Sequence, residues 1–181
     1  AAAPASSPGA SAGDPTASLA ALFGGTTKPA DLIASGSAIR PARVAHFVQL
    51  TSQALGAFVA VHGALRGAYV ARFAHGSRIV DATAAADGRL ETLRFRELLR
   101  DPATPNDGIA DLQALFAGKS DPNATPQIAR FAGDVKNRLG AYQNATWNGD
   151  GYYVAKFANR SANVWLGVES GKIDGIYTME R

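Results

Sequence analysis

The three histidines, His46, His62 and His75, are the side chains of this sequence best suited to acid–base chemistry near neutral pH. We expect His46 on a helix, His62 near a strand and His75 at a turn. The chain contains an internal repeat, described below, and no position carries a histidine in both copies; His75 is matched by Asn159. Histidines scattered in this way favour surface and turn positions over a catalytic centre.

Motifs for phosphate, zinc and calcium sites are absent from the sequence. It has no Gly-x-x-x-x-Gly-Lys-[Ser/Thr] loop, no His-Glu-x-x-His and no calcium-binding loop. It also has no cysteine, which excludes disulfides and thiolate metal sites. We therefore expect no cofactor, no bound metal and no enzymatic activity.

Positive charge is concentrated in the first half of the chain. Residues 18–100 contain ten Lys/Arg and five Asp/Glu, a balance of +5, whereas residues 105–181 contain eight of each. Asp14 and Asp101 bring the net charge to +3. Such a modest excess, without a Lys-rich run or a recognition helix, argues against nucleic acid as a partner.

Outward-facing arginines and aromatic residues are the candidates for binding. Arg72, Arg94 and Arg96 fall on the outward face of the first predicted sheet, as a solvated surface or as a site for an anionic group. The equivalent face of the second sheet carries Tyr152, Lys156, Trp165 and Tyr177. Clusters of outward-facing Tyr and Trp residues usually mark a contact surface. The contact predicted here is with the sheet of the other copy, with a second chain or with an external partner.

The first seventeen residues, AAAPASSPGASAGDPTA, contain no large apolar side chain. Such a segment cannot bury enough surface to offset its ordering entropy, so we predict a flexible tether over residues 1–17. The composition and the start at Ala1 without Met are typical of a chain processed after export, which predicts a periplasmic, cell-surface or secreted protein. A fragment simply cloned from that residue is the alternative. No run of 18 apolar residues occurs, so we expect no membrane span.

An internal repeat organises the remaining sequence. A shift of 84 residues aligns positions 41–86 with 125–170 without a gap. Within this alignment Gly67-Ala-Tyr-Val-Ala-Arg-Phe-Ala74 matches Gly151-Tyr-Tyr-Val-Ala-Lys-Phe-Ala158 at six of eight positions. Upstream, Leu19–Phe23 matches Leu112–Phe116 once a longer connection is allowed in the first copy. The repeat predicts two units, over residues 18–100 and 101–181.

Each copy begins with a predicted helix and continues with predicted strands. The helices are indicated by apolar residues at helical spacing, which are Val44, Phe47, Leu55 and Phe58 in the first copy and Ile128, Phe131, Val135, Leu139 and Tyr142 in the second. Alternating residues such as Tyr69, Ala71 and Phe73 then indicate strands, and short Gly-containing turns make them antiparallel. Leu90 and Leu93 are three residues apart, which predicts a bulge in the last strand. The fold class is therefore α+β, with two tandem units of a helical segment on a four-stranded antiparallel sheet.

This order of elements resembles the cystatin-like fold, and more narrowly the ketosteroid-isomerase-like modules that precede penicillin-binding or β-lactamase-like domains in exported bacterial proteins. The matching segments are Phe73-Ala-His75 and Asp87-Gly-Arg-Leu-Glu-Thr-Leu93, with their partners in the second copy. The tandem architecture also resembles secreted β-lactamase inhibitor proteins, without a shared motif. The Ser-x-x-Lys motif of a β-lactamase-like enzyme is absent.

The resemblance leaves three functions open. The first is an exported, non-catalytic accessory protein that binds a protein or a small ligand through its sheet faces or through the junction between the copies. The second is a ketosteroid-isomerase-like pocket enzyme or ligand carrier, which would need a carboxylate beside an inward phenol; Tyr69 and Tyr153 face inward, but no acidic residue clearly does. The third is an accessory domain or inhibitor of a penicillin-recognising enzyme. We expect the first.

Overall fold

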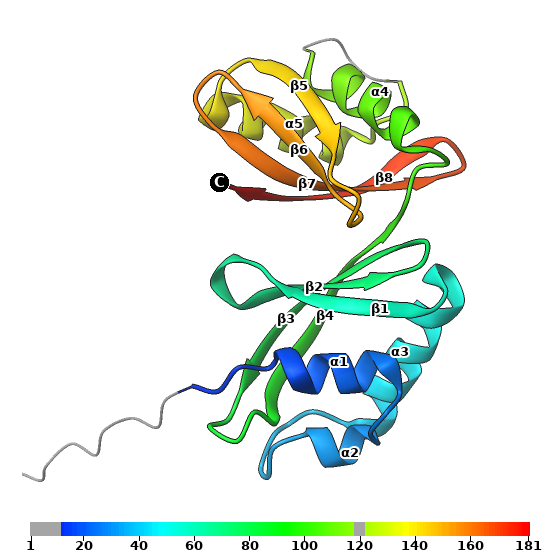
Figure 1. Cartoon of the computed structure of the whole chain (residues 1–181), viewed down its shortest axis with the longest axis vertical. Coiled ribbons are helices and arrows are strands. Elements are labelled where there is room, and N and C mark those ends of the chain that lie inside the picture. The colour runs from blue at the N-terminus through cyan, green and yellow to red at the C-terminus, as the bar shows by residue number, and fades with distance from the viewer. Residues whose placement is uncertain (1–11, 118–121) are drawn as a thin grey trace, which may run out of the picture.

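The computed structural model describes residues 12–117 and 122–181, and it contains two four-stranded antiparallel sheets, each preceded by helices. The α+β class predicted from the sequence is confirmed, and the arrangement is that of two tandem repeats. The two units are stacked end to end, with one sheet facing the other (Figure 1).

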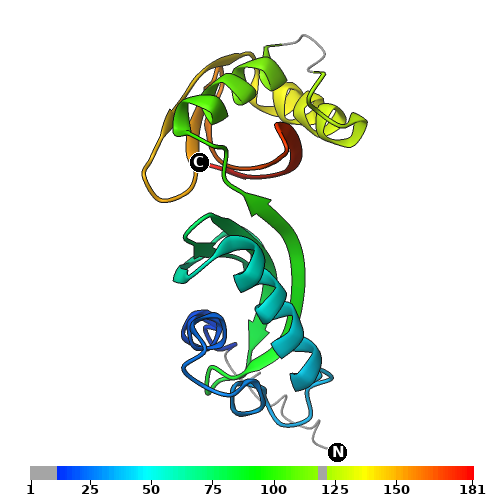
Figure 2. The ribbon, with the colours of Figure 1, turned by 90° about the vertical axis from the view of Figure 1, so that its right-hand side faces the viewer.

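In both units helices precede four strands, and the first unit also contains α2, which has no counterpart among the described residues of the second. The first contains α1 (Thr16–Gly24), α2 (Pro29–Leu32), α3 (Pro41–Leu55), β1 (Phe58–Gly63), β2 (Ala68–Phe73), β3 (Gly76–Ala84) and β4 (Leu90–Arg100). The second contains α4 (Pro105–Phe116), α5 (Pro126–Leu139), β5 (Tyr142–Trp147), β6 (Tyr153–Phe157), β7 (Ser161–Glu169) and β8 (Lys172–Glu180). Strands pair in chain order in each sheet. In Figure 2, α3 runs along the side of the first sheet next to β4.

The two long helices end earlier than their apolar stripes suggest. Gly56 and Gly140 follow them with φ of 82° and 87°, a conformation that ends a helix and that glycine adopts without strain. Phe58 and Tyr142, which the sequence assigns to the helical stripes, are instead the first residues of β1 and β5. The stripes continue across the turn because both rings pack on the same cores as the helices.

Strand register confirms that the sheets repeat one another. Phe58 pairs with Phe73 in the first sheet and Tyr142 with Phe157 in the second, and the same irregularity follows each pair. The predicted bulge near the start of the last strand occurs in both sheets, opposite Ala84 and Val168.

Each unit has its own apolar core between helices and sheet. Phe23 of α1 meets Phe73 edge-on at 5.7 Å between ring centroids, and Phe116 of α4 meets Phe157 in the same way at 5.2 Å. These pairs correspond in the repeat. The short helices α1 and α4 therefore complete the cores that α3 and α5 begin.

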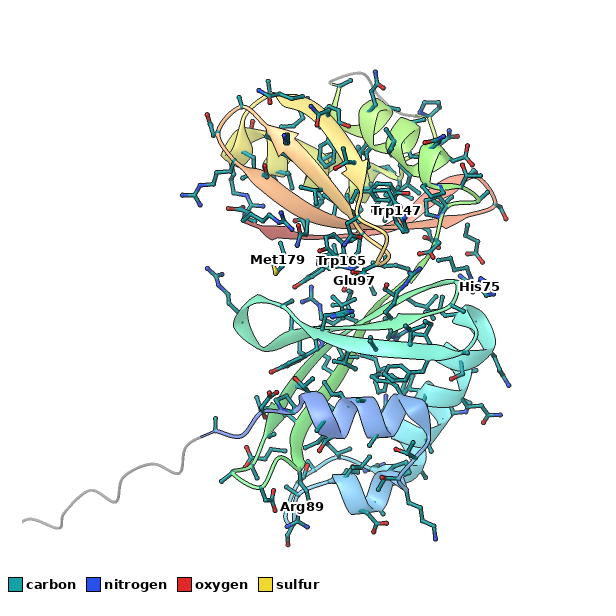
Figure 3. The ribbon with its side chains drawn as sticks, viewed as in Figure 1. His75, Arg89, Glu97, Trp147, Trp165 and Met179 are labelled. Atoms are coloured by element: carbon teal, nitrogen blue, oxygen red, sulfur yellow. The ribbon has the colours of Figure 1, made fainter. Side chains whose placement is uncertain are left out.

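The facing sides of the two sheets form a third, smaller core. Its buried members are Val70, Ile79, Leu99 and Trp165, and Tyr152, Tyr177 and Met179 pack against them. Figure 3 shows Trp165 and Met179 between the sheets. An ion pair of 3.2 Å between Arg100 and Glu169 also joins the units. We call this contact the junction.

The chain before α1 is partly built into the first unit. Residues 1–11 of the predicted tether lie outside the described residues. The backbone N–H of Gly13 donates to the carbonyl of Ala84 at 3.0 Å, and Asp14 accepts from the backbone N–H of Thr16 at 2.9 Å. In the structure the first unit therefore begins near Gly13. None of the helices in the described ranges has the length and apolar character of a membrane span.

Candidate functional site

A groove of about 510 Å³ lies beside the start of α3, between this helix and the edge strand β4. Its size is that of a small-ligand site. Four arginines and a set of apolar side chains line it: Ala38, Ile39, Arg40, Arg43, Val44, Phe47, Arg78, Leu93, Arg94 and Phe95. We call it the arginine groove.

Two of the arginines are positioned by aromatic rings. The guanidinium carbon of Arg43 lies 5.7 Å from the ring centroid of Phe47, and that of Arg78 lies 5.4 Å from the centroid of Phe95. The two rings stack on each other at 5.1 Å. A ring face attracts a guanidinium through its quadrupole and leaves the N–H groups in the guanidinium plane unused. The rings therefore hold the charges in place without neutralising them.

The groove's arginines have no acidic partner in the described part of the chain. The other arginines of the first sheet are largely paired, because Arg72, Arg89, Arg96 and Arg100 each form an ion pair. None of Arg40, Arg43, Arg78 and Arg94 does so with a described residue. Four arginines that form no ion pair with a described residue thus line one groove.

Arg78 is the most constrained of the four. Its Nε atom is buried and has no hydrogen-bond partner among the described residues. Burial lowers the pKa of its guanidinium, and the negative charge of Glu97 acts in the opposite direction. An arginine stays protonated despite such a shift. Buried N–H donors are normally satisfied, and this one is an exception among the described residues.

The first turn of α3 adds a favourable potential for an anion. Arg40 precedes the helix and Pro41 begins it, with no side-chain cap and no acidic residue in the first turn. The corresponding helix α5 is capped, because the Thr125 hydroxyl accepts from the backbone N–H of Ile128 at 3.3 Å. The uncapped N–H groups of α3 carry partial positive charge beside the groove.

The second unit shows that the fold does not need these residues. The positions equivalent to Arg40, Arg43, Arg78 and Phe95 are Ala124, Gln127, Ala162 and Thr178. The connection before the long helix is also longer in the first unit, where residues 25–40 replace 117–125. This longer connection supplies Ala38, Ile39 and Arg40 to the groove wall. Several of the differences between the two units therefore lie at the arginine groove.

The three arginines proposed from the sequence differ in their contacts. Arg94 is exposed and lines the arginine groove. Arg72 makes two hydrogen bonds to Asp101, at 2.7 and 2.6 Å. Arg96 binds Asp81 at 3.3 Å and lies 5.6 Å from the ring of Tyr177, at the junction.

The three aromatic residues proposed from the second sheet lie together, inside the junction. Trp165 is 5% exposed and packs on Tyr152 at 4.9 Å and on Tyr177 at 5.6 Å. The contact anticipated for Trp165 is thus with the first unit's sheet, one of the alternatives left open by the sequence (Figure 3). Lys156 is exposed and is not part of this cluster.

A second hollow of about 420 Å³ lies beside the segment that joins the units, and its lining includes His75, Trp147 and Tyr153. Tyr153 is buried, its hydroxyl donates to the carbonyl of Pro105 at 3.2 Å, and burial raises its pKa. Of the acidic residues near this phenol, Asp101 is paired with Arg72 and Asp107 caps the start of α4. These two carboxylates already have structural partners.

Sequence reasoning missed Arg40, Arg43 and Arg78 as site residues. Their signal is the difference between the copies, since each faces an uncharged residue in the repeat alignment. The described residues contain no cluster of His, Asp and Glu able to hold a metal.

Comparison of the chain with protein-family models, with curated proteins and with solved structures finds no match. The resemblance to cystatin-like and ketosteroid-isomerase-like modules therefore remains an expectation from the sequence. Function has to be inferred from the groove itself.

Proposed function

We propose that this protein is a non-catalytic binding protein that holds an anionic ligand in the arginine groove. The observation that carries the proposal is that four arginines, none of which forms an ion pair with a described residue, line one groove together with apolar side chains. Two of them lie over phenyl rings, a contact that does not use their N–H groups.

The energetics of the groove favour an occupied state. Like charges gathered beside a partly buried wall repel each other, and an anion removes that repulsion. Each hydrogen bond between a guanidinium and an oxyanion contributes roughly 1.5–3 kcal/mol. Two such bonds alone correspond to a Kd on the order of millimolar, and burial of an organic group strengthens it.

The junction is a weaker candidate for the same function. The residues expected to bind there, Trp165 above all, pack between the units and are not open to a ligand. The groove, in contrast, is open to solvent and keeps its charges unpaired. This contrast favours the groove over the sheet faces as the binding site.

Calorimetric titration with phenyl phosphate tests the proposal. The variants Arg78→Ala and Arg43→Gln each introduce the residue found at the equivalent position of the second unit, where the fold accepts it. We expect each to weaken binding by about tenfold, since one charge-assisted contact is lost. Arg130→Gln, which removes an exposed arginine on α5, serves as the control and should bind like the parent. Equal affinities in all four proteins would contradict the proposal.

A further inference from the structure

We infer that the ligand of the arginine groove is a small amphipathic anion, with one oxyanion head (a carboxylate, phosphate or sulfate) joined to an apolar body. This inference rests on the proposed function and names the chemical class of the ligand. It follows from how charge and apolar surface are arranged in and around the groove.

The head is indicated by the position of the charges. Arg43 lies over the ring of Phe47 and Arg78 over the ring of Phe95, and Arg40 stands at the uncapped start of α3. An oxyanion bound in the groove can accept hydrogen bonds from guanidinium groups of the arginines that line it. Bidentate contacts of this kind suit a carboxylate, phosphate or sulfate.

The apolar body is indicated by the rest of the lining. Ile39 and Leu93 are half-buried and contribute aliphatic surface to the same groove, which Phe47 and Phe95 also line. The two rings already contact each other and the guanidinium groups. An inorganic ion would leave this aliphatic surface in water, whereas an organic body would cover it.

A long polyanion does not fit the charge distribution. Along β4 the unpaired charge of the groove stops at Arg96, which is bound by Asp81 and Glu97. In the turn just before the same strand, Arg89 is paired with Asp87. The unpaired charge is therefore a compact spot flanked by neutralised positions, which matches one small molecule and not a nucleic acid or an acidic polysaccharide.

Two matched pairs of probes test this inference: phenyl phosphate against inorganic phosphate, and phenylacetate against acetate. We expect the amphipathic member of at least one pair to bind about tenfold more tightly than its inorganic or small counterpart, because part of a ring leaves water. Phenol, which lacks the charge, should not bind measurably. Leu93→Ser and Ile39→Ser should weaken the amphipathic probe and leave the inorganic one unchanged, with melting curves showing that each variant is folded.

The two claims fail separately in this experiment. Equal affinity within both pairs would overturn the inference while the groove remained an anion site. Binding of phenol as tight as that of phenyl phosphate, or unchanged binding in Arg78→Ala, would overturn the proposed function itself. The absence of binding by every probe would overturn both.

Discussion

Leu99 of the first unit lies directly on Gly175 of the second, where a Cβ atom would stand 2.5 Å from Leu99 Cδ2. Gly167, the cross-strand partner of Gly175, lies under the same side chain, at 2.9 Å for its own Cβ position. In the first sheet these two positions are Thr83 and Thr92, whose hydroxyls are 2.7 Å apart. The glycine pair is thus a slot that admits Leu99 and brings the units together.

Filling this slot should open the junction. Gly167→Thr introduces the residue of the first unit, but its side chain would meet Leu99, including the backbone Cα at 3.1 Å. We expect a loss of about 1–3 kcal/mol in the free energy of unfolding. We also expect a red shift of Trp165 fluorescence, measured in a Trp147→Phe background, because the indole leaves the junction.

Gly133→Ala is the control for that experiment. This glycine lies within α5, and a Cβ there would meet nothing within 4 Å. Alanine should stabilise the helix by roughly 0.5–1 kcal/mol. A Gly167→Thr protein as stable as its parent, with unchanged Trp165 emission, would show that Leu99 does not depend on the slot.

Two phenylalanines of the second unit, both expected from the sequence to be core residues, differ in burial. Phe157 is 4% exposed and belongs to the buried cluster, whereas Phe131 is half-buried at its margin. Phe157→Ala should therefore lower the free energy of unfolding by about 3–5 kcal/mol, and Phe131→Ala by clearly less. Urea denaturation measures both, and the reverse order would place α5 differently on the sheet.

The repeat made most of the fold predictable. Phe73 and Phe157 occupy the same position in the two sheets, each paired with the first residue of the neighbouring strand. The pattern of strand residues therefore occurs twice in the sequence, and each copy supports the assignment of the other. The sequence places Phe58 and Tyr142 in the helices, whereas they begin β1 and β5. The helix and the following strand both direct apolar residues into the same core. Apolar spacing alone therefore does not reveal the turn between them. Gly56, which follows the last residue of α3, marks the end of that helix in the sequence.

The groove was not predictable from the repeat alone. Arg78 lies on the strand β3 and Arg43 on the helix α3, and only the folded chain brings both of them to the groove that Phe47 and Phe95 line. The longer connection before α3 has no counterpart in the second copy, so its path could not be inferred by comparison. Trp165 was correctly assigned to the side away from the core of its own unit, but its partner depends on how the two units dock.

Alkaline pH should destabilise the protein through Tyr153. Burial raises the pKa of this phenol above its ordinary value of 10.0, so the folded state favours the protonated form. The contribution to stability is complete below about pH 10 and is lost as pH rises above that value toward the folded pKa. Unfolding free energies measured across this range should fall with pH, and Tyr153→Phe should reduce the slope. It will not abolish the slope, because burial also raises the pKa of Tyr142 and Tyr177. An unchanged slope in Tyr153→Phe would contradict the burial of this phenol.

Two truncations should differ in stability. Removal of residues 1–11, which contain no large apolar side chain, should leave the thermal midpoint unchanged. Removal through Asp14, which the sequence predicts to be equally harmless, should lower the midpoint, since the Gly13–Ala84 hydrogen bond and the Asp14 contacts to Thr16 are lost. Identical midpoints for the two truncated proteins would show that residues 12–14 contribute nothing to the first unit.

Chemical-shift mapping of the backbone amides during titration with phenyl phosphate tests the central claim most directly, because the two units provide an internal comparison within one sample. The account predicts that the amides of Val44 and Phe95, and others along the arginine groove, shift progressively and saturate. The amides of Ile128 and Thr178, at the equivalent positions of the second unit, should stay unchanged. Saturable shifts of equal size in both units, or shifts confined to the second, would contradict the assignment of the groove as the binding site.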